Sequence, residues 1–289
     1  MRRRFVAAGL SVVLAVQRVS AAEGDIGAKI DKFELERCHV DRDTSKRVCK
    51  PTRRQPSCPN PASGSCLYIW AGESDPDPRE DFIVSVHYRI DGVERLCTGT
   101  IIGDNHVLTA GHCGCGERDS YQIGLGWDIH HDNRIPVIGG PVLFSPSICT
   151  GRPVRGRDIA LLRIPDLAAK IRAPGYRPEL LSDYRAALRR GPVTVVGYGY
   201  TEHENYGRRM IASIPVYSAD CTERRLERWC APYAEMVLAD VSEGGRQVDS
   251  CAGDSGGPVF LKVGDRRLLV GITSRAFQPF AGNTRRPCG

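Results

Sequence analysis

The sequence predicts an all-β protein, folded as a barrel or a sandwich, and three observations lead to this fold class. Apolar and polar residues alternate with a period of two in several short runs, as in residues 82–90. Gly and Pro separate these runs at short intervals. Two runs, residues 258–263 and 266–274, are joined across Gly264 and Asp265 and predict a hairpin. Many short strands separated in this way favour a closed or packed β architecture.

The clearest predicted strand covers residues 82–90, which read FIVSVHYRI. Residues 97–102 and 192–199 follow the same pattern, whereas residues 178–190 alone predict a helix, because their apolar residues recur at helical spacing. One face of the first strand is formed by Val84, Val86, Tyr88 and Ile90, and the other by Ser85, His87 and Arg89. The apolar residues of the helix are Leu180, Leu181, Tyr184 and Leu188.

The first residues of the chain have the features of an export signal. Three arginines precede an apolar run that is too short to cross a bilayer, and small residues follow at Ala21 and Ala22. We therefore interpret residues 1–22 as a signal peptide. No later run is long enough to anchor the chain in a membrane, so we expect a secreted protein, either extracellular or periplasmic.

The net charge comes largely from this segment. The whole chain has 40 basic and 34 acidic residues, for a formal charge of +6, and residues 1–22 contain four of the arginines and no acid. Without them the balance is 36 basic against 34 acidic residues. The remaining arginine pairs are scattered and are interpreted as solvated surface, which does not favour a nucleic-acid partner.

Twelve cysteines in an exported chain favour a disulfide framework over metal or redox chemistry. Residues 112–115 read HCGC, but no second pair at ligand spacing supports zinc. Residues 23–68 are interpreted as a disulfide-stapled pro-segment, or alternatively as a binding or targeting module. The four cysteines of this segment allow three internal pairings. Alternatively, one of these cysteines tethers the segment to the rest of the chain. The four are Cys38, Cys49, Cys58 and Cys66.

Three motifs carry the candidate chemistry. LTAGHC ends at Cys113, DIALL begins at Asp158, and GDSGGP contains Ser255. In this order and spacing the chain resembles the chymotrypsin/trypsin family of serine proteases over residues 69–289. The resemblance implies two packed six-stranded antiparallel β-barrels. Members of the family continue past the cysteine that corresponds to Cys288, so we expect a second barrel that is truncated at its C-terminal end and has an open edge.

The resemblance also implies a role for each motif residue. Ser255 is the expected nucleophile, His112 its general base, and Asp158 the group that orients and stabilises the histidine. Gly253 and Ser255 are expected to donate their N–H groups to an oxyanion. The implied reaction is hydrolysis of peptide bonds in protein or peptide substrates, with no cofactor and no metal.

Residues beside the nucleophile are expected to set specificity. Asp249 matches the base of the primary specificity pocket, where a carboxylate selects Arg or Lys. Ser274 and Ala276 match the segment that lines the substrate cleft. Between them, Arg275 replaces a large apolar residue with a charged one, which leaves the preference at neighbouring subsites open.

Activation by proteolysis is a further implication. Asp254 matches the carboxylate that pairs with a new N-terminus in the family, and a gapless alignment places Ile69 at that terminus. Tyr68 precedes it, so a different protease is the expected activator, unless trimming begins at Arg54 or no activation of this kind occurs. We also expect self-cleavage at Arg208 and Arg209.

For the disulfides, the resemblance implies Cys97 with Cys113 and Cys251 with Cys288. Cys221 and Cys230 are expected to close a local loop, which leaves Cys115 with Cys149.

Two alternatives stand beside this reading. The first is a catalytically inactive, protease-like binding protein, suggested by the short C-terminal end. The second is a metal site in residues 128–133, DIHHDN, through His130, His131 and Asp132, against which a solvated loop is the preferred interpretation.

Overall fold

The computed structural model describes residues 10–15, 38–40, 47–49, 72–150, 155–167, 188, 191–201, 206–239, 250–264 and 266–277. The regular structure of this part of the chain consists of antiparallel strands and short 3-10 turns, which confirms the predicted all-β fold class. The helix predicted over residues 178–190 lies outside the described residues except for Leu188, which is buried.

Within the described ranges, the search for a helix of sufficient length and hydropathy to span a membrane finds none.

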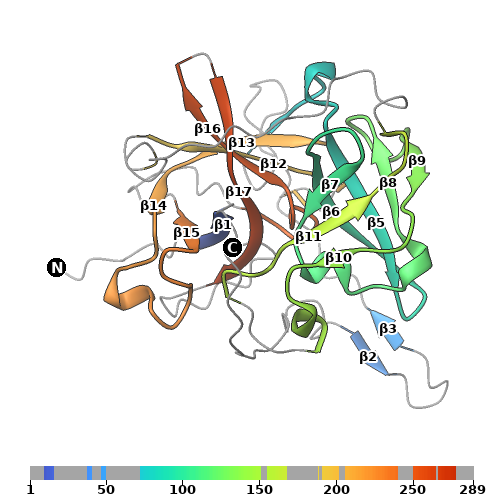
Figure 1. Cartoon of the computed structure of the whole chain (residues 1–289), viewed down its shortest axis with the longest axis horizontal. Helices are drawn as coiled ribbons and strands as arrows, with labels where there is room; N and C mark the ends of the chain where they lie inside the picture. The colour runs from blue at the N-terminus through green and yellow to red at the C-terminus, as the bar shows by residue number, and fades with distance from the viewer. Residues whose placement is uncertain are drawn as a thin grey trace, which may run out of the picture.

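The first barrel is a seven-stranded antiparallel sheet, on the right in Figure 1. Its hairpin of β5 and β6 turns through Asp91 and Gly92, whose positive φ angles suit the tight turn between twisted strands. In spatial order the strands are β10 (Val142–Leu143), β11 (Ala160–Arg163), β7 (His106–Thr109), β6 (Val93–Ile101), β5 (Ile83–Ile90), β8 (Gln122–Leu125) and β9 (Asn133–Pro136).

The second barrel is an eight-stranded antiparallel sheet, on the left in Figure 1. The predicted hairpin forms, with β16 paired to β17 and Gly264 at a positive φ in its turn. In spatial order the strands are β14 (Val216–Ser218), β15 (Glu235–Leu238), β1 (Leu10–Ala15), β17 (Arg266–Phe277), β16 (Pro258–Val263), β12 (Val193–Gly197), β13 (Met210–Ile214) and β4 (Glu73–Ser74).

Strand β1 comes from the segment that the sequence predicts to be a signal peptide. It lies between β15 and β17 (Figure 1), with Val12 opposite both Val237 and Arg275. The edge of β17 that was expected to be open is therefore covered in this structure, because β1 supplies backbone donors and acceptors to both neighbours.

A separate two-stranded sheet lies in the cysteine-rich segment. It consists of β2 (Cys38–Val40) and β3 (Arg47–Cys49), and Cys38 is directly opposite Cys49. The other two cysteines of that segment lie outside the described residues.

Short 3-10 turns connect the strands. They are η3 (Pro78–Glu80), η4 (His112–Gly114), η5 (Arg118–Ser120), η6 (Pro146–Thr150) and η7 (Arg224–Leu226).

The apolar cores of the two barrels meet. The core of the first barrel includes side chains from the second sheet, namely Val196, Tyr198, Phe260, Leu269 and Ile272. Each large apolar side chain fully buried in this way contributes about 1.5–3 kcal/mol through the hydrophobic effect. The junction between the barrels is therefore a packed and rigid scaffold.

Tyr198 ties the barrels together by hydrogen bonds as well. Its fully buried hydroxyl group lies 3.0 Å from the carbonyl oxygen of Ile83 and 2.5 Å from that of Gly126. Burial raises the pKa of the Tyr198 phenol far above its ordinary value, so the hydroxyl stays protonated and donates.

Arg209 corrects the prediction of an exposed, self-cleaved loop. Its side chain is fully buried and pairs with Asp75 at 3.3 Å and Asp81 at 3.2 Å. Its backbone N–H donates to Trp127, and its carbonyl accepts from Asp75. A peptide bond held in this way cannot enter a protease cleft, whereas the neighbouring Arg208 is 64% exposed.

Candidate active site

His112 begins the short turn η4, directly after the strand β7. Cys113 forms a disulfide with Cys97 of β6, and Cys115 forms one with Cys149, so cross-links hold this turn at Cys113 and at its C-terminal end. The imidazole remains 30% exposed, which allows a substrate to reach it. The same disulfides remove the thiolates that the weak zinc reading of residues 112–115 needed.

Asp158 lies just before β11 and faces the histidine. Its Oδ2 atom is 2.8 Å from His112 Nδ1, and its Oδ1 atom accepts the backbone N–H of His112 at 2.7 Å. Ser274 Oγ donates to the same Oδ2 at 2.6 Å. The carboxylate therefore fixes the orientation of the ring through Nδ1, so that Nε2 is the nitrogen that acts as the base.

The protonation state of Asp158 follows from these contacts. Burial alone raises the pKa of this carboxyl, but the charge of His112 and the hydrogen bonds from His112 and Ser274 outweigh it. The pKa of Asp158 therefore lies below its ordinary value, and the group is ionised at neutral pH.

Ser255 lies half-buried on the loop before β16, and its backbone lies beside the histidine turn. Its carbonyl oxygen accepts the backbone N–H of Thr98 at 2.8 Å and lies 3.7 Å from Cys113 Sγ. The next residue, Gly256, has a φ of +83°, and a Cβ atom there would lie 2.7 Å from the backbone nitrogen of Ala110. Glycine at this position thus lets the serine loop approach the segment that bears His112.

Thr98 holds the serine loop from the first barrel, a role that no sequence motif indicates. Its fully buried Oγ1 donates to the carbonyl oxygen of Gly253 at 2.8 Å and accepts the N–H of Tyr198 at 3.0 Å. Gly253 itself has a φ of +101°, and a Cβ atom there would lie 2.7 Å from Gly199 Cα. The candidate oxyanion loop is therefore fixed by contacts to both barrels.

Asp254, between these glycines, is completely buried. Its Oδ1 atom accepts the N–H of Gly199 at 2.8 Å, and its Oδ2 atom accepts that of Cys251 at 2.8 Å. The expected partner, Ile69, lies outside the described residues.

Arg275, the charged residue that stands where the family has a large apolar one, is paired in this structure. Its guanidinium group donates to both carboxylate oxygens of Glu235, each at 2.8 Å, and to the carbonyl oxygen of Trp229 at 2.9 Å. Glu235 is completely buried and was missed in the sequence, because its partners come from three separate segments.

For the remaining predicted residues, the structure describes only a backbone position or a disulfide, or does not describe the residue. Asp249 and Cys288 lie outside the described residues, and Cys251 is disulfide-bonded. Ala276 belongs to β17, where its backbone is opposite Ser11 of β1. The remaining disulfide in the described ranges joins Cys221 to Cys230.

The metal reading of residues 128–133 is not supported by the described side chains. His130 and His131 are exposed. Asp132 instead points inward and accepts a hydrogen bond from Ser85 Oγ at 3.0 Å, in the first barrel.

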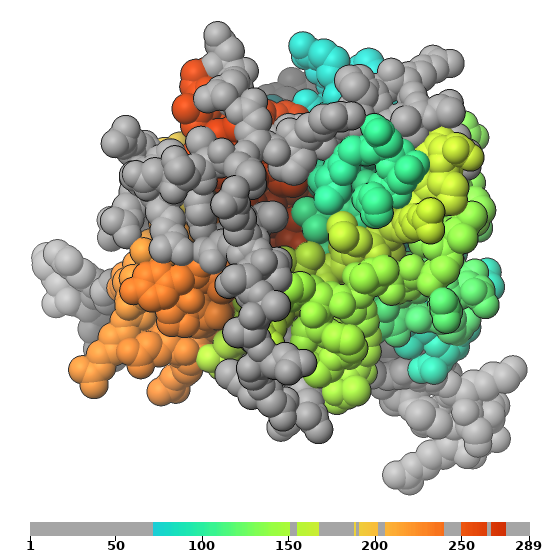
Figure 2. All heavy atoms as spheres, in the orientation of Figure 1, coloured from blue at the N-terminus to red at the C-terminus, as the bar shows by residue number. Residues whose placement is uncertain are grey.

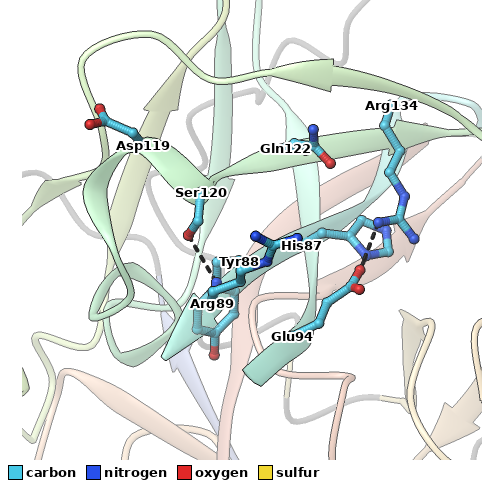
Figure 3. A pocket seen from close by; sticks show the side chains of 8 residues that line it. All are labelled: His87, Tyr88, Arg89, Glu94, Asp119, Ser120, Gln122 and Arg134. Carbon is cyan, nitrogen blue, oxygen red and sulfur yellow. Dashed lines mark hydrogen bonds and ion pairs between the residues drawn. The ribbon is translucent and has the colours of Figure 1, made fainter. Parts of the chain in front are cut away.

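Ser85 and Asp132 belong to a polar cluster, which we call the β5 cluster, made by Ser85, His87, Glu94, Asp132 and Arg134. His87 Nε2 is 2.9 Å from Ser85 Oγ, and His87 Nδ1 is 3.2 Å from Glu94 Oε1. Arg134 donates to Glu94 at 2.6 Å, and Figure 3 shows His87, Glu94 and Arg134 in the lining of a surface pocket.

The β5 cluster changes the interpretation of strand β5. Ser85 and His87 were expected on the face opposite its apolar residues, yet Ser85 is 1% and His87 3% exposed. Both faces of the strand are thus covered, one by the apolar core and the other by polar partners that satisfy the buried groups.

Comparison with known proteins gives matches to trypsins and trypsin-like proteases. The family model described as Trypsin matches residues 69–287, which include every strand from β4 to β17. A trypsin of Saccharopolyspora erythraea is 29% identical over 203 residues, covering 63% of this chain and 75% of that protein. A trypsin-like protease of Streptomyces glaucescens is 29% identical over 206 residues, covering 69% of this chain and 70% of that protein.

Proposed function

Because this chain belongs to the trypsin family of serine proteases, it is a serine endopeptidase that acts on protein or peptide substrates, and we propose that it cleaves after Arg and Lys with Ser255, His112 and Asp158. One observation carries the assignment of the catalytic residues: the hydrogen-bonded series from Ser274 through Asp158 to His112, beside the loop of Ser255.

In the first half of the reaction, Ser255 Oγ attacks the carbonyl carbon of the scissile bond. Its proton passes to Nε2 of His112, and Asp158 stabilises the imidazolium that results. When the tetrahedral intermediate collapses, the C–N bond breaks and His112 gives the proton to the leaving amine. The product is an ester between the substrate acyl group and Ser255.

The backbone N–H groups of Gly253 and Ser255 stabilise the negative oxygen of the intermediate. Such donors work best when they are already fixed before the reaction, because no reorganisation is then needed. The hydrogen bonds of Thr98 to the carbonyl oxygens of Gly253 and Ser255 support this role, since they fix the loop on both sides of Asp254.

In the second half, water takes the place of the amine. His112 accepts a proton from water, the resulting hydroxide attacks the ester, and collapse returns the proton to Ser255 Oγ. The overall reaction consumes one water molecule for each peptide bond hydrolysed and returns Ser255 and His112 to their starting states.

Asp249 selects the basic side chain at the cut. A carboxylate at the base of a pocket pairs with an Arg or Lys side chain and is left unpaired by an apolar one. The support for this step is its sequence position, six residues before Ser255 and two before Cys251.

Activation releases Ile69 as a new N-terminus, whose ammonium group pairs with Asp254. The complete burial of Asp254 supports this, because a buried carboxylate needs strong partners. Residues 1–22 act as the export signal, so that β1 pairs with β15 and β17 only until this segment is removed, and the cysteine-rich residues 23–68 act as the pro-segment. The disulfides of the described residues fit an oxidising compartment.

The test is labelling with a serine-directed phosphonate before and after limited proteolysis, read by intact mass. The wild type should gain one adduct and Ser255→Ala none. N-terminal sequencing of the labelled species should begin at Ile69; another start would overturn the activation step alone. A folded wild type that is never labelled would contradict the assignment of Ser255.

Specificity needs a separate measurement. Matched peptide anilides with Arg, Lys or Phe before the scissile bond should give hydrolysis of the first two only. Asp249→Ser should abolish that preference while the phosphonate still labels Ser255. Equal hydrolysis of the Phe substrate by the wild type would contradict the role of Asp249.

A further inference from the structure

Among the described residues outside the proposed triad, Glu235 is a carboxylate that accepts four hydrogen bonds. It opens strand β15, and its side chain is completely buried. Each oxygen accepts two hydrogen bonds, one from Arg275 and one from a backbone N–H. The backbone donors are Gly156 at 2.7 Å and Ala231 at 2.7 Å. A buried carboxylate with four donors holds its partners in fixed positions.

One of these partners belongs to the loop that bears the triad carboxylate. Gly156 precedes Asp158 by two residues, has a φ of +72°, and would bring a Cβ atom within 2.7 Å of Ala234 Cβ. Only glycine therefore fits this close approach. Arg155 Nη1 donates to the carbonyl oxygen of Glu227 at 3.1 Å and fastens the loop at a second point. Figure 2 shows these parts of the two barrels, green and orange, side by side on the same face.

The second path to Asp158 runs through β17. Arg275 Nη1, which is bonded to Glu235, also lies 3.4 Å from Ser274 Oγ. Ser274 Oγ in turn donates to Asp158 at 2.6 Å. Glu235 thus contacts both the loop before Asp158 and the residue next to the serine that bonds Asp158.

We propose that Glu235 is a positioning residue for Asp158, acting through Gly156 on one side and through Arg275 and Ser274 on the other. Its pairing also neutralises Arg275, so that this arginine forms a fixed wall beside the substrate strand and does not attract acidic side chains of the substrate. The proposal rests on the proposed function of Asp158, His112 and Ser255.

The main variants are Glu235→Gln, which keeps the shape but turns an NH2 group toward N–H donors, and Arg275→Lys, which keeps the charge but loses the paired bonds. The matched control is Glu80→Gln, which breaks the ion pair to Arg267, a residue at the start of β17 far along the strand from Ser274. Each variant is activated, its active sites are titrated with phosphonate, and kcat, KM and the pH profile are measured on an Arg anilide.

Glu235→Gln should lower kcat per active site by about 10- to 100-fold, the cost of a small displacement of catalytic groups. KM for the single-residue substrate should stay within about twofold. The acid limb of kcat/KM should move to lower pH, because a displaced Asp158 favours the imidazolium of His112 less strongly. A purely structural role would lower the number of active sites without moving this limb.

Arg275→Lys should give smaller changes in the same direction, and Glu80→Gln none. Unchanged kcat and an unchanged acid limb in folded Glu235→Gln would overturn the proposal. If Glu235→Gln does not fold, the same result in Arg275→Lys would overturn it. A wild type that fails to cleave or take up phosphonate counts against the proposed function instead, before any variant is compared.

The neutralisation of Arg275 by Glu235 is tested by a separate measurement of substrate preference. The wild type should cleave peptides with Asp, Asn or Ala in the two positions before the basic residue at similar rates, since Glu235 already neutralises the guanidinium. A preference of more than about tenfold for Asp over Asn, which corresponds to an unpaired desolvated charge, would contradict this part of the proposal.

Discussion

The part of the chain that the structure describes holds two arrays of serine, histidine and carboxylate that differ in access and in surroundings. At the site, His112 contacts Asp158 at 2.8 Å beside the loop of Ser255. In the β5 cluster, His87 contacts Ser85 at 2.9 Å and Glu94 at 3.2 Å. Yet Ser85 is 1% exposed in the middle of a paired strand, whereas Ser255 lies half-buried on a loop bounded by positive-φ glycines.

This difference teaches that a serine in an array with a histidine and a carboxylate is not a nucleophile for that reason alone. Ser85 Oγ already contacts Asp132 and His87 inside the first barrel, and its strand has no loop of free N–H donors. His112, by contrast, is 30% exposed and faces a loop with a fixed backbone. The following predictions separate the two arrays, from the largest expected effect to the smallest.

The first prediction exchanges each serine for alanine. Ser255→Ala should lower kcat on an Arg anilide by about 10⁴- to 10⁶-fold, as loss of the nucleophile does in triad proteases. Ser85→Ala should keep kcat per active site within about twofold and lower the free energy of unfolding by about 1–2 kcal/mol, because Asp132 loses a donor. Anilide kinetics and urea unfolding measure the two effects. Comparable losses of kcat in both variants would break the distinction.

The second prediction exchanges the carboxylates. Asp158→Asn should lower kcat about 10⁴-fold, the usual cost of holding a triad histidine in the wrong tautomer. Glu94→Gln should leave kcat unchanged and cost about 0–1 kcal/mol of stability, since its ion pair with Arg134 is half-exposed. Stopped-time hydrolysis assays, with the enzyme concentration set by active-site titration, give the ratio of each variant's kcat to that of the wild type. A loss of kcat in Glu94→Gln would show that the β5 cluster acts on the reaction.

The third prediction concerns the contact between the barrels at Thr98. Thr98→Val removes the donor to Gly253 and the acceptor for Tyr198 while keeping the side-chain volume. We expect kcat to fall about tenfold, less than the loss of an oxyanion donor itself. The cost in stability should be about 1–3 kcal/mol. Thr98→Ser, which keeps the hydroxyl, is the matched control and should retain most of kcat; an equal loss in both variants would contradict the role of the hydrogen bonds.

The fourth prediction compares the carboxylates by acid unfolding. The pKa of Asp158 and that of Glu94 both lie below their ordinary values: burial opposes the shift at each, and His112 with Ser274, or Arg134 with His87, outweighs it. Each ionised group therefore stabilises the fold above its unfolded-state pKa, about 4, and this stabilisation is lost as the pH falls through the lower folded-state value.

The measurement uses Ser255→Ala as the background, so that self-digestion does not interfere. The difference in unfolding free energy between this protein and its Asp158→Asn form should shrink as the pH is lowered from 5 to below 4. The corresponding difference for Glu94→Gln should shrink less, because Glu94 is half-exposed. A difference for Asp158→Asn that stays constant with pH would contradict the lowered pKa.

Sequence patterns predicted the parts of this molecule that depend on neighbours along the chain. The strands β5, β6, β12, β16 and β17 follow from alternation and from glycine turns. His112, Asp158 and Ser255 were predicted because each lies in a short motif. The contacts around these motifs could not be predicted in the same way. Glu235 shows why, because its hydrogen-bond partners are 79, 40 and 4 residues away along the chain.

Two further misses have the same physical origin. Arg209 was predicted to be exposed because arginine is rarely buried without partners, and its partners, Asp75 and Asp81, lie more than 100 residues earlier. Strand β1 was not predicted, because an apolar run after three arginines is typical of an export signal. Both depend on which distant segments meet, which a single sequence does not state.

The short ladder of β4, β13 and β12 limits how far a released N-terminus has to travel. Ser74 is opposite Met210, Met210 is opposite Gly197, and a Cβ atom on Gly197 would touch the carboxylate of Asp254. Two strand spacings separate Ser74 from Gly197, about 10 Å in all. The five residue steps from Ile69 to Ser74 span about 17 Å when extended. Under the proposed activation, an N-terminus at Ile69 reaches Asp254 with about 7 Å to spare, whereas a cut three residues further along the chain leaves the new terminus too short to reach it.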